Sequence, residues 1–133
     1  MNHANISVIL IIPSASYRTN PFIDAATKLD INILVITDKS QVFSEYYPDN
    51  VITMNFEHWQ ESIENIHEWS ERYDLKAVIG VDEESIILAA KLSESLCIEH
   101  NSLESVKLTK NKYLMRSELK KSGLKSPWFK RFS

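Results

Sequence analysis

Two short polar segments hold the side chains best suited to bind a small molecule. The first, residues 13–20 (PSASYRTN), combines several hydroxyl groups with the guanidinium of Arg18 and the amide of Asn20. It stands just before a helical pattern, and the start of a helix attracts carboxylate and phosphate groups. The same side chains could instead only cap that helix, and the residues leave both interpretations open.

The second polar segment is residues 82–84 (DEE). Its carboxylates could bind the amine of a substrate. They could also serve the local structure, with Asp82 as the N-cap of a helix and Glu83 and Glu84 near the positive end of the helix dipole. From the residues alone, the capping interpretation is favoured.

Several other chemistries are disfavoured by the motifs that the sequence lacks. Residues 13–20 contain no glycine, so the G-x-G-x-x-G turn of dinucleotide-binding proteins is absent. No Walker loop or nucleophile elbow occurs, and no residue is assigned a catalytic role. The four histidines are scattered, and neither H-E-x-x-H nor C-x-x-C is present, so no metal site is expected.

The only cysteine, Cys97, lies in the apolar run LCI at residues 96–98. We expect it to be a small buried side chain rather than a reactive thiol. A single cysteine without a partner is typical of the reducing cytoplasm, which we expect as the location. No stretch approaches the roughly 20 apolar residues that span a bilayer, so no membrane partner is expected.

Apolar runs and helical patterns alternate along the chain. The predicted strands are residues 6–12, 31–36, 51–54 and 77–81, and the predicted helices are residues 21–29, 56–73, from 82 to about 96, and 109–122. The predicted N-caps are Thr19 or Asn20, Asn55, Asp82 and Thr109, and Gly123 is expected to stop the last helix. Trp59 and Trp69, both in the second helix, are expected to pack in the core.

This alternation is the βαβ pattern, whose right-handed crossovers produce a parallel sheet. We therefore expect an α/β, Rossmann-like fold with an open parallel sheet of about four strands in the order 3-2-1-4 and helices on both faces. The strand order then switches between the first and fourth strands, and ligands of such sheets bind beyond the carboxyl ends of the strands at that point. Both polar segments are the loops at this switch.

Charge is distributed unevenly. Residues 1–99 contain 6 Lys/Arg and 16 Asp/Glu, residues 100–133 contain 9 and 2, and the net charge is −3. The basic segment could contact phosphate groups, an acidic domain or nucleic acid, or could simply be a solvated helix face. It lacks the interleaved aromatic residues of single-strand nucleic-acid surfaces, which disfavours nucleic acid as a partner.

Several segments, in their order and spacing, point to a known family. They are residues 17–26, 35–38, 77–85, 100–106, 109–116 and 123–127. The most specific is Thr109–Arg116 (TKNKYLMR), which is similar to a D-K pair, an aromatic residue and M-R, with Asn111 in place of the usual acid. Together they resemble the N-terminal, pre-ATP-grasp domain of ATP-grasp ligases, the superfamily of carbamoyl-phosphate synthase, biotin carboxylase and the glycinamide ribonucleotide ligases.

The resemblance implies a domain division and a set of roles. Residues 1–124 would form the pre-ATP-grasp domain, and residues 125–133 would begin the connection to an ATP-grasp domain that the chain does not include. Lys112 would contact the ATP phosphates. The acceptor substrate would be held by Tyr17, Arg18 and Thr19 in the first loop and by Asp82 or Glu83 in the second. The parent enzyme would use ATP and Mg²⁺, neither of which this chain alone is expected to bind tightly.

We therefore predict the substrate-binding N-terminal domain of an ATP-dependent carboxylate–amine ligase that forms C–N bonds through an acyl phosphate. Its partners would be a small carboxylate or amine and the ATP-grasp domain, and the chain alone is expected to be inactive. The alternative is a stand-alone, non-catalytic ligand-binding or partner-docking α/β module. The residues leave open which carboxylate and amine are joined and whether the protein forms homo-oligomers.

Overall fold

The computed structural model describes residues 6–39 and 48–132. The chain divides into two compact units, Met1–His100 and Asn101–Ser133, each of which is treated by itself. The division after residue 124, which concerns the domains of the parent protein, stays a prediction. No helix within the described ranges is long and apolar enough to cross a membrane.

The first unit is built on four parallel strands in the order β3-β2-β1-β4. The strands are β1 (Ile6–Ile11), β2 (Asn32–Thr37), β3 (Val51–Thr53) and β4 (Asp74–Gly80). The predicted strand order and the all-parallel sheet are confirmed. Strand β4 begins three residues earlier than the apolar run predicted, because Asp74 and Leu75 pair with the first residues of β1, Ile6 and Ser7.

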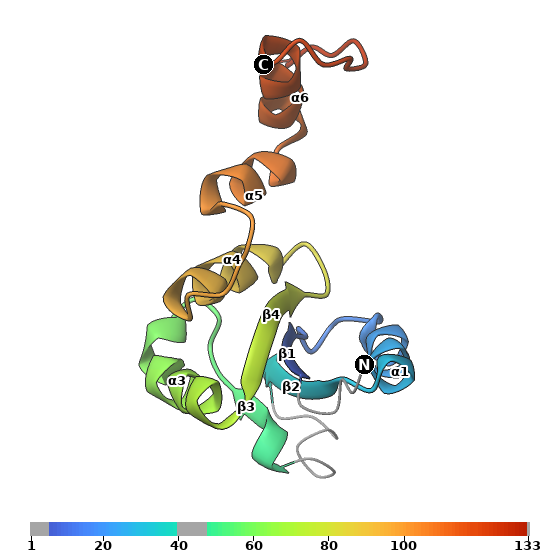
Figure 1. Ribbon diagram of the computed structural model, residues 1–133. Helices are drawn as coiled ribbons and strands as arrows, with labels where there is room; N and C mark the ends of the chain where they lie inside the picture. The colour runs from blue at the N-terminus through green and yellow to red at the C-terminus, as the bar shows by residue number, and fades with distance from the viewer. Residues whose placement is uncertain (1–5, 40–47, 133) are drawn as a thin grey trace. The chain divides into compact units, whose positions relative to one another are not determined.

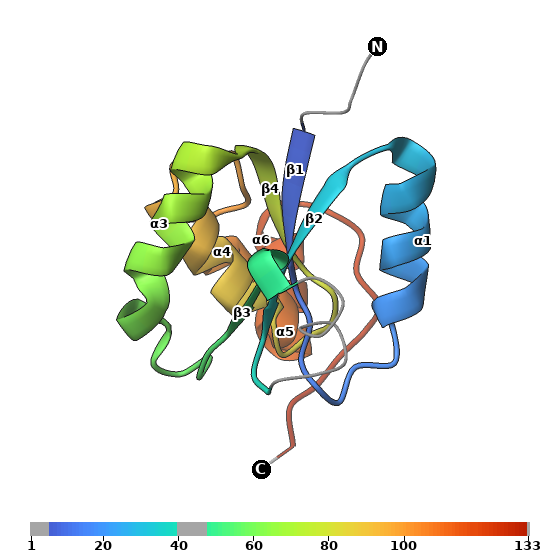
Figure 2. The ribbon, with the colours of Figure 1, turned by 90° about the horizontal axis from the view of Figure 1, so that it is seen from below.

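Helices cover both faces of this sheet, as predicted (Figures 1 and 2). Helix α1 (Thr19–Leu29) lies on one face, and helices α3 (Ile63–Arg72) and α4 (Ile86–Ser95) lie on the other. Two short 3₁₀ helices, η1 (Pro48–Asn50) and η2 (Trp59–Ser62), complete the described elements of the first unit.

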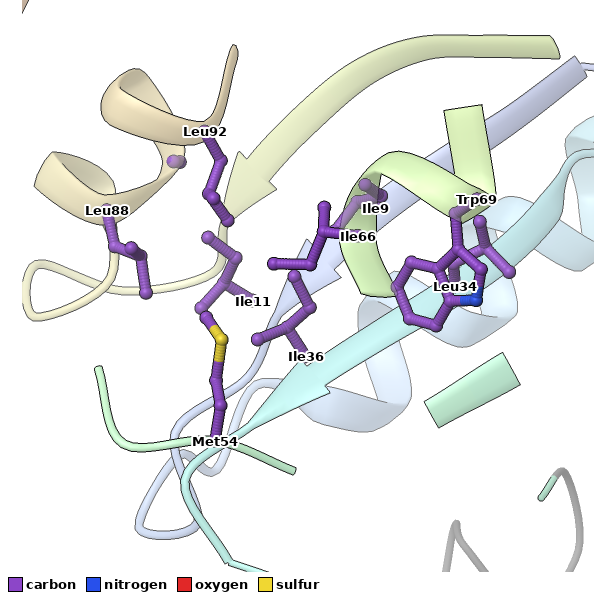
Figure 3. Close-up of a cluster of buried hydrophobic side chains, with 10 residues drawn as sticks. Ile9, Ile11, Leu34, Ile36, Met54, Ile66, Trp69, Leu88 and Leu92 are labelled. Carbon is purple, nitrogen blue, oxygen red and sulfur yellow. The ribbon is translucent and has the colours of Figure 1, made fainter. Parts of the chain in front are cut away.

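The larger core cluster lies between the sheet and helices α3 and α4 (Figure 3). Side chains from alternate positions of β1 and β2 meet side chains from both helices there. Its most deeply buried members are Ile9, Ile11, Leu34, Ile36, Ile66 and Leu92. Trp69 is 4% exposed in this cluster and Trp59 packs against it, so the predicted packing role of both tryptophans is confirmed. The smaller cluster lies on the α1 face, where Phe22 packs against Leu10, Ile12, Val35 and Val81.

Several predicted helix starts are wrong. The predicted helix from residue 56 to 73 is two elements, η2 and α3. Asn55 begins a turn instead of capping the helix, since its Oδ1 accepts the backbone N–H of Glu57 at 2.9 Å. Helix α1 begins at Thr19 itself and has no side-chain cap, so neither Thr19 nor Asn20 is the N-cap. Side-chain hydrogen bonds to nearby backbone groups can form in a turn as well as at a helix N-cap. The surrounding structure determines which of the two forms.

The second unit consists of helices α5 (Leu103–Lys110) and α6 (Lys112–Lys121) with the segment that follows them. The sequence predicted one helix with Thr109 as its cap. Instead Thr109 lies within α5, and α6 is capped by Asn111, whose Oδ1 accepts the N–H groups of Tyr113 and Leu114, both at 3.1 Å. Ser102 caps α5 by accepting the N–H of Ser105 at 3.2 Å.

Three helices end on a residue in the left-handed conformation. These residues are Asp30 (φ 53°), Cys97 (φ 54°) and Gly123 (φ 73°). In each case the next residue donates its N–H to a carbonyl five positions back, as in the Schellman motif. The prediction that Cys97 is buried is wrong, because the turn that ends α4 leaves this side chain exposed.

Candidate functional site

Strands β1 and β4 are neighbours, although the chain passes through β2 and β3 between them. Strands β2 and β3 follow β1 along one direction of the sheet, whereas β4 lies next to β1 in the opposite direction. Backbone hydrogen bonds continue beyond both strands, from Val81 N–H to the Ile11 carbonyl (3.2 Å) and from Ile12 N–H to the Ile36 carbonyl (2.8 Å). The loops after β1 and β4 therefore start side by side, at the type of edge where open α/β sheets bind ligands.

The loop after β1 is a tight turn followed directly by helix α1. The N–H of Ser16 donates to the Pro13 carbonyl at 2.9 Å, which closes the turn. The N–H of Arg18 then donates to Ser16 Oγ at 3.3 Å. The loop hydroxyl groups thus shape the loop, and the first turn of α1 has no side-chain cap.

Tyr17 and Arg18 project from this loop into solvent, with Tyr17 85% exposed. The guanidinium carbon of Arg18 lies 5.5 Å from the centre of the Tyr17 ring, and Nε and Nη2 each lie 3.4 Å from the Tyr17 hydroxyl. Thr19, the first residue of α1, is half-buried. Of the three predicted substrate-binding residues in the first loop, Tyr17 and Arg18 are therefore exposed, and Thr19 is less accessible.

The charge of Arg18 is coupled to the loop after β4. Its pKa is raised, first by the hydrogen bond with the Tyr17 hydroxyl and further by the carboxylates of Asp82 and Glu83. Opposite charges raise the pKa of a cation only when they are near it. The neighbouring ends of β1 and β4 place four of the predicted residues, which belong to two loops far apart in the sequence, at one edge of the sheet.

Asp82 and Glu83 have different roles in the second loop. Oδ1 of Asp82 lies 3.2 Å from both the Glu84 N–H and the hydroxyl of Ser85, which is fully buried. Asp82 therefore holds the loop together. The prediction that it caps a helix is wrong, because α4 begins only at Ile86. Glu83 is exposed and is the predicted carboxylate better placed to contact a ligand.

A close backbone approach fixes this loop against the end of β4. A Cβ atom added to Gly80 would lie 2.7 Å from Ile86 N and from the carbonyl carbon of Ser85. Contacts this short do not occur in real structures, so only glycine fits here. Gly80 lets the start of α4 lie directly on the strand end and thereby sets the position of residues 82–85.

Asp38, at the carboxyl end of β2, is a site residue that the sequence analysis missed. Its Oδ1 accepts the N–H of Ser14 at 2.6 Å, and its Oδ2 accepts the Ser14 hydroxyl at 3.1 Å. Burial raises the pKa of this carboxyl, but the two bonds from Ser14, with smaller contributions from the backbone N–H of Asp38 and the charge of Lys39, outweigh burial and leave the pKa lowered. The sequence feature that could have identified Asp38 is its position directly after the strand predicted to lie next to the first strand.

Lys112 belongs to the second unit, where it is the exposed first residue of α6. Asn111 provides the cap of this helix, a function that aspartate and asparagine perform about equally well. Asn111, at the position where the resemblance would place an acid, thus caps the helix that begins at Lys112. Within residues 6–39 and 48–132, no three His, Cys, Asp or Glu side chains are grouped as a metal site would require.

The first unit thus belongs to the open parallel α/β sheets, and polar loops lie at its strand-order switch. No protein-family model matches the chain, and no curated protein matches it either. Among solved structures, it is similar to the L-amino acid ligase from Bacillus licheniformis, with 20% sequence identity and a TM-score of 0.73. The match covers 97% of this chain and 33% of the ligase chain, in its N-terminal part. The chain therefore spans one third of the ligase structure, and the likeness establishes the fold.

Proposed function

We propose that this chain is the N-terminal substrate-binding domain of an ATP-dependent carboxylate–amine ligase. The observation that carries the proposal is the sheet edge where the loops after β1 and β4 start side by side, with Arg18 exposed in the first loop and Glu83 exposed in the second. A guanidinium binds a carboxylate and a carboxylate binds an ammonium group, so this edge offers complementary partners for both reacting groups. The sequence resemblance to ATP-grasp ligases and the structural likeness to the N-terminal part of an L-amino acid ligase support it.

The reaction proposed for the parent enzyme has two steps. A substrate carboxylate oxygen attacks the γ-phosphorus of ATP, the bond to ADP breaks, and an acyl phosphate forms. The amine nitrogen then attacks the acyl carbon, phosphate leaves, and the amine loses a proton. Mg²⁺ would neutralise charge on the transferring phosphate. Tyr17, Arg18, Thr19 and Glu83 would bind the substrate, and Asp82 would hold the loop that contains Glu83.

The nucleotide is proposed to contact the second unit through Lys112. Its ammonium is exposed at the first turn of α6, where a cation and the positive end of the helix dipole both attract a phosphate. The partner would be an ATP-grasp domain of the same parent protein, acting in the cytoplasm. The chain alone is expected to show no Mg²⁺-dependent consumption of ATP, which a coupled assay for ADP would detect.

Titration of the ¹⁵N-labelled chain with single L-amino acids tests the substrate-binding role, because these molecules carry both a carboxylate and an amine. We expect saturable changes in the NMR signals of Arg18 and Glu83. Arg18→Ala should weaken the binding about tenfold or more, since hydrogen bonds between charged groups are worth about 1.5–3 kcal/mol.

Arg72→Ala is the matched control. Arg72 is also an arginine stacked on the neighbouring tyrosine, 5.6 Å from the Tyr73 ring centre, but it ends α3 rather than lying in a switch loop. It should leave binding unchanged. If no L-amino acid perturbs Arg18 or Glu83, the substrate-binding role is wrong and the non-catalytic docking module becomes the better explanation.

A further inference from the structure

One carboxylate outside the predicted site holds the turn on which Arg18 depends. Asp38 accepts two hydrogen bonds from Ser14, one from its N–H at 2.6 Å and one from its hydroxyl at 3.1 Å. These residues are 24 positions apart in the sequence. The contact therefore joins the loop after β1 to the end of β2, and no local turn preference produces it.

The geometry requires a group with two acceptors. Both atoms of Ser14 donate, and they meet the two separate oxygens of the Asp38 carboxylate. An asparagine would keep one acceptor and turn an NH₂ group toward the other donor. Hydrogen bonds to an ionised carboxylate are also shorter and stronger than bonds between neutral groups. The lowered pKa of Asp38 agrees with this charged state.

Asp38 is itself attached to the rigid part of the sheet. The preceding residue, Thr37, is 3% exposed at the end of β2, and its carbonyl accepts the N–H of Met54 at 2.9 Å. The Thr37 hydroxyl donates to the Lys39 carbonyl at 3.2 Å. The carboxylate thus extends from a backbone held by hydrogen bonds on both sides, so it can fix the position of Ser14.

The restraint reaches Arg18 through a short chain of contacts. Ser14 is the second residue of the turn that the Ser16 N–H closes on the Pro13 carbonyl. Ser16 Oγ in turn accepts the N–H of Arg18. A shift of Ser14 therefore displaces the hydroxyl that holds the Arg18 backbone, and the guanidinium of Arg18 moves with that backbone.

We propose that Asp38 is a positioning residue, which acts through Ser14 to hold Tyr17 and Arg18 at the sheet edge in the geometry that binds substrate. The inference rests on the proposed function for what the loop binds. The restraint itself does not depend on any ligand, so the two can be tested separately.

The first test follows backbone amide signals of the ¹⁵N-labelled full chain during an acid titration without ligand. The Ser14 signal should move with the protonation of Asp38, and the Ser16 and Arg18 signals should move with the same midpoint. Asp38→Asn should abolish the transition of this midpoint at all three residues. Asp24→Asn, which removes an exposed carboxylate on α1, should preserve them. If Ser14 alone follows Asp38, the positioning role is overturned.

Amide hydrogen exchange measures the same restraint at neutral pH. Asp38→Ala should accelerate exchange at Ser14 about tenfold or more, and should also accelerate it at Ser16 and Arg18, because a charge-assisted bond is lost. Leu34, in the core, should exchange as before. Should Asp38→Ala fail to fold, Ser14→Ala removes only the hydroxyl bond and should accelerate exchange at Arg18 to a smaller extent. Unchanged exchange at Arg18 in both variants contradicts the proposal.

L-amino acid binding by the variants separates this inference from the proposed function. If the wild-type chain binds, Asp38→Asn should weaken binding while Asp24→Asn does not. If the wild-type chain binds no amino acid but Ser16 and Arg18 still follow Asp38, the proposed function fails and the restraint stands. If amino acids bind equally to wild type and Asp38→Asn, the positioning role is overturned and the proposed function stands.

Discussion

At the scale of single residues, three helices end in the left-handed conformation, whose free-energy cost depends on the side chain. Gly123 adopts a left-handed conformation without a steric cost, whereas Asp30 and Cys97 adopt the same conformation with a Cβ atom. Aspartate can tolerate this region through its short polar side chain, but cysteine has no such compensation. Cys97 is thus the most strained of the three positions.

Cys97→Gly is expected to stabilise the protein by about 1 kcal/mol, because it removes the Cβ from a left-handed helix end. Urea unfolding in the presence of a reductant measures this change. Cys97→Ala keeps a Cβ and is the matched control, for which no comparable gain is expected. Equal stabilities of the two variants would show that the strain at Cys97 is negligible.

A second residue-scale prediction concerns acid stability and Asp38. Its pKa in the folded protein lies below the ordinary value of 3.8, since the effect of burial is outweighed by the bonds from Ser14 together with the backbone N–H of Asp38 and the charge of Lys39. A carboxyl whose pKa is lower in the folded protein than in the unfolded protein stabilises the fold at pH values above its unfolded pKa. This stabilisation is lost as the pH falls through the pKa of the folded protein.

Wild type should therefore be more stable than Asp38→Asn near neutral pH, and the difference should shrink as the pH falls below 3.8 and through the lowered pKa of the folded protein. Urea unfolding at a series of pH values measures it. The exposed carboxylate variant Asp24→Asn should show no comparable pH-dependent difference from wild type. A difference for Asp38→Asn that is the same at every pH would mean that its charge does not contribute.

At the scale of elements, the shape of the proposed binding edge depends on how closely the start of α4 approaches the end of β4. Ser85 is fully buried, and its hydroxyl lies 3.0 Å from the Asp82 carbonyl, so the connection between strand and helix is a compact turn. Gly80 permits this approach, since a Cβ would lie 2.7 Å from backbone atoms of Ser85 and Ile86. The position of Glu83 is thus a consequence of strand-to-helix packing.

Gly80→Ala is expected to destabilise the first unit by about 1–3 kcal/mol, because the added methyl group must displace backbone. Thermal or urea unfolding measures the loss, and NMR signals of residues 82–85 should shift. Gly123→Ala provides a contrast. A Cβ at position 123 would meet nothing within 4 Å, so this substitution should cost only the free energy of placing alanine in the left-handed conformation. The NMR signals of residues 82–85 should stay unchanged. Unchanged stability in Gly80→Ala would contradict the close approach.

At the scale of the whole molecule, the apolar core and the basic charge lie in different units. The buried hydrophobic residues of the described chain all lie between Ile9 and Leu92, within the first unit. Helices α5 and α6 contain no buried residue, and residues 100–133 hold 9 of the 15 Lys/Arg. Burial of apolar surface is the main stabilising term in folding, so the first unit holds its own source of stability.

A fragment of residues 1–100 is therefore expected to fold and to unfold at nearly the same temperature as the full chain. We expect a difference smaller than about 4 °C, the least shift that 1 kcal/mol produces in a domain of this size. Circular dichroism melting curves of both proteins measure it. A larger drop would favour the domain boundary at residue 124, which the family resemblance implies.

The sequence by itself determined the class of fold and the order of the strands. Continuous apolar runs such as residues 6–12 indicate strands buried on both faces, and their alternation with helices permits few topologies. This order was sufficient to place Arg18 and Glu83 in loops at one edge, because the carboxyl ends of parallel strands share an edge.

Only the tertiary structure decided which polar residues serve the loops and which remain available to a ligand. Asp82 and Glu83 are adjacent acids in the sequence, but Asp82 is bonded to Ser85 and Glu84 while Glu83 is exposed. The local sequence pattern likewise predicted neither the hydrogen bond between Asp38 and Ser14 nor the exposure of Cys97. The physical reason is that hydrogen bonds and backbone turns between distant or competing groups depend on three-dimensional distances, which residue periodicity does not encode.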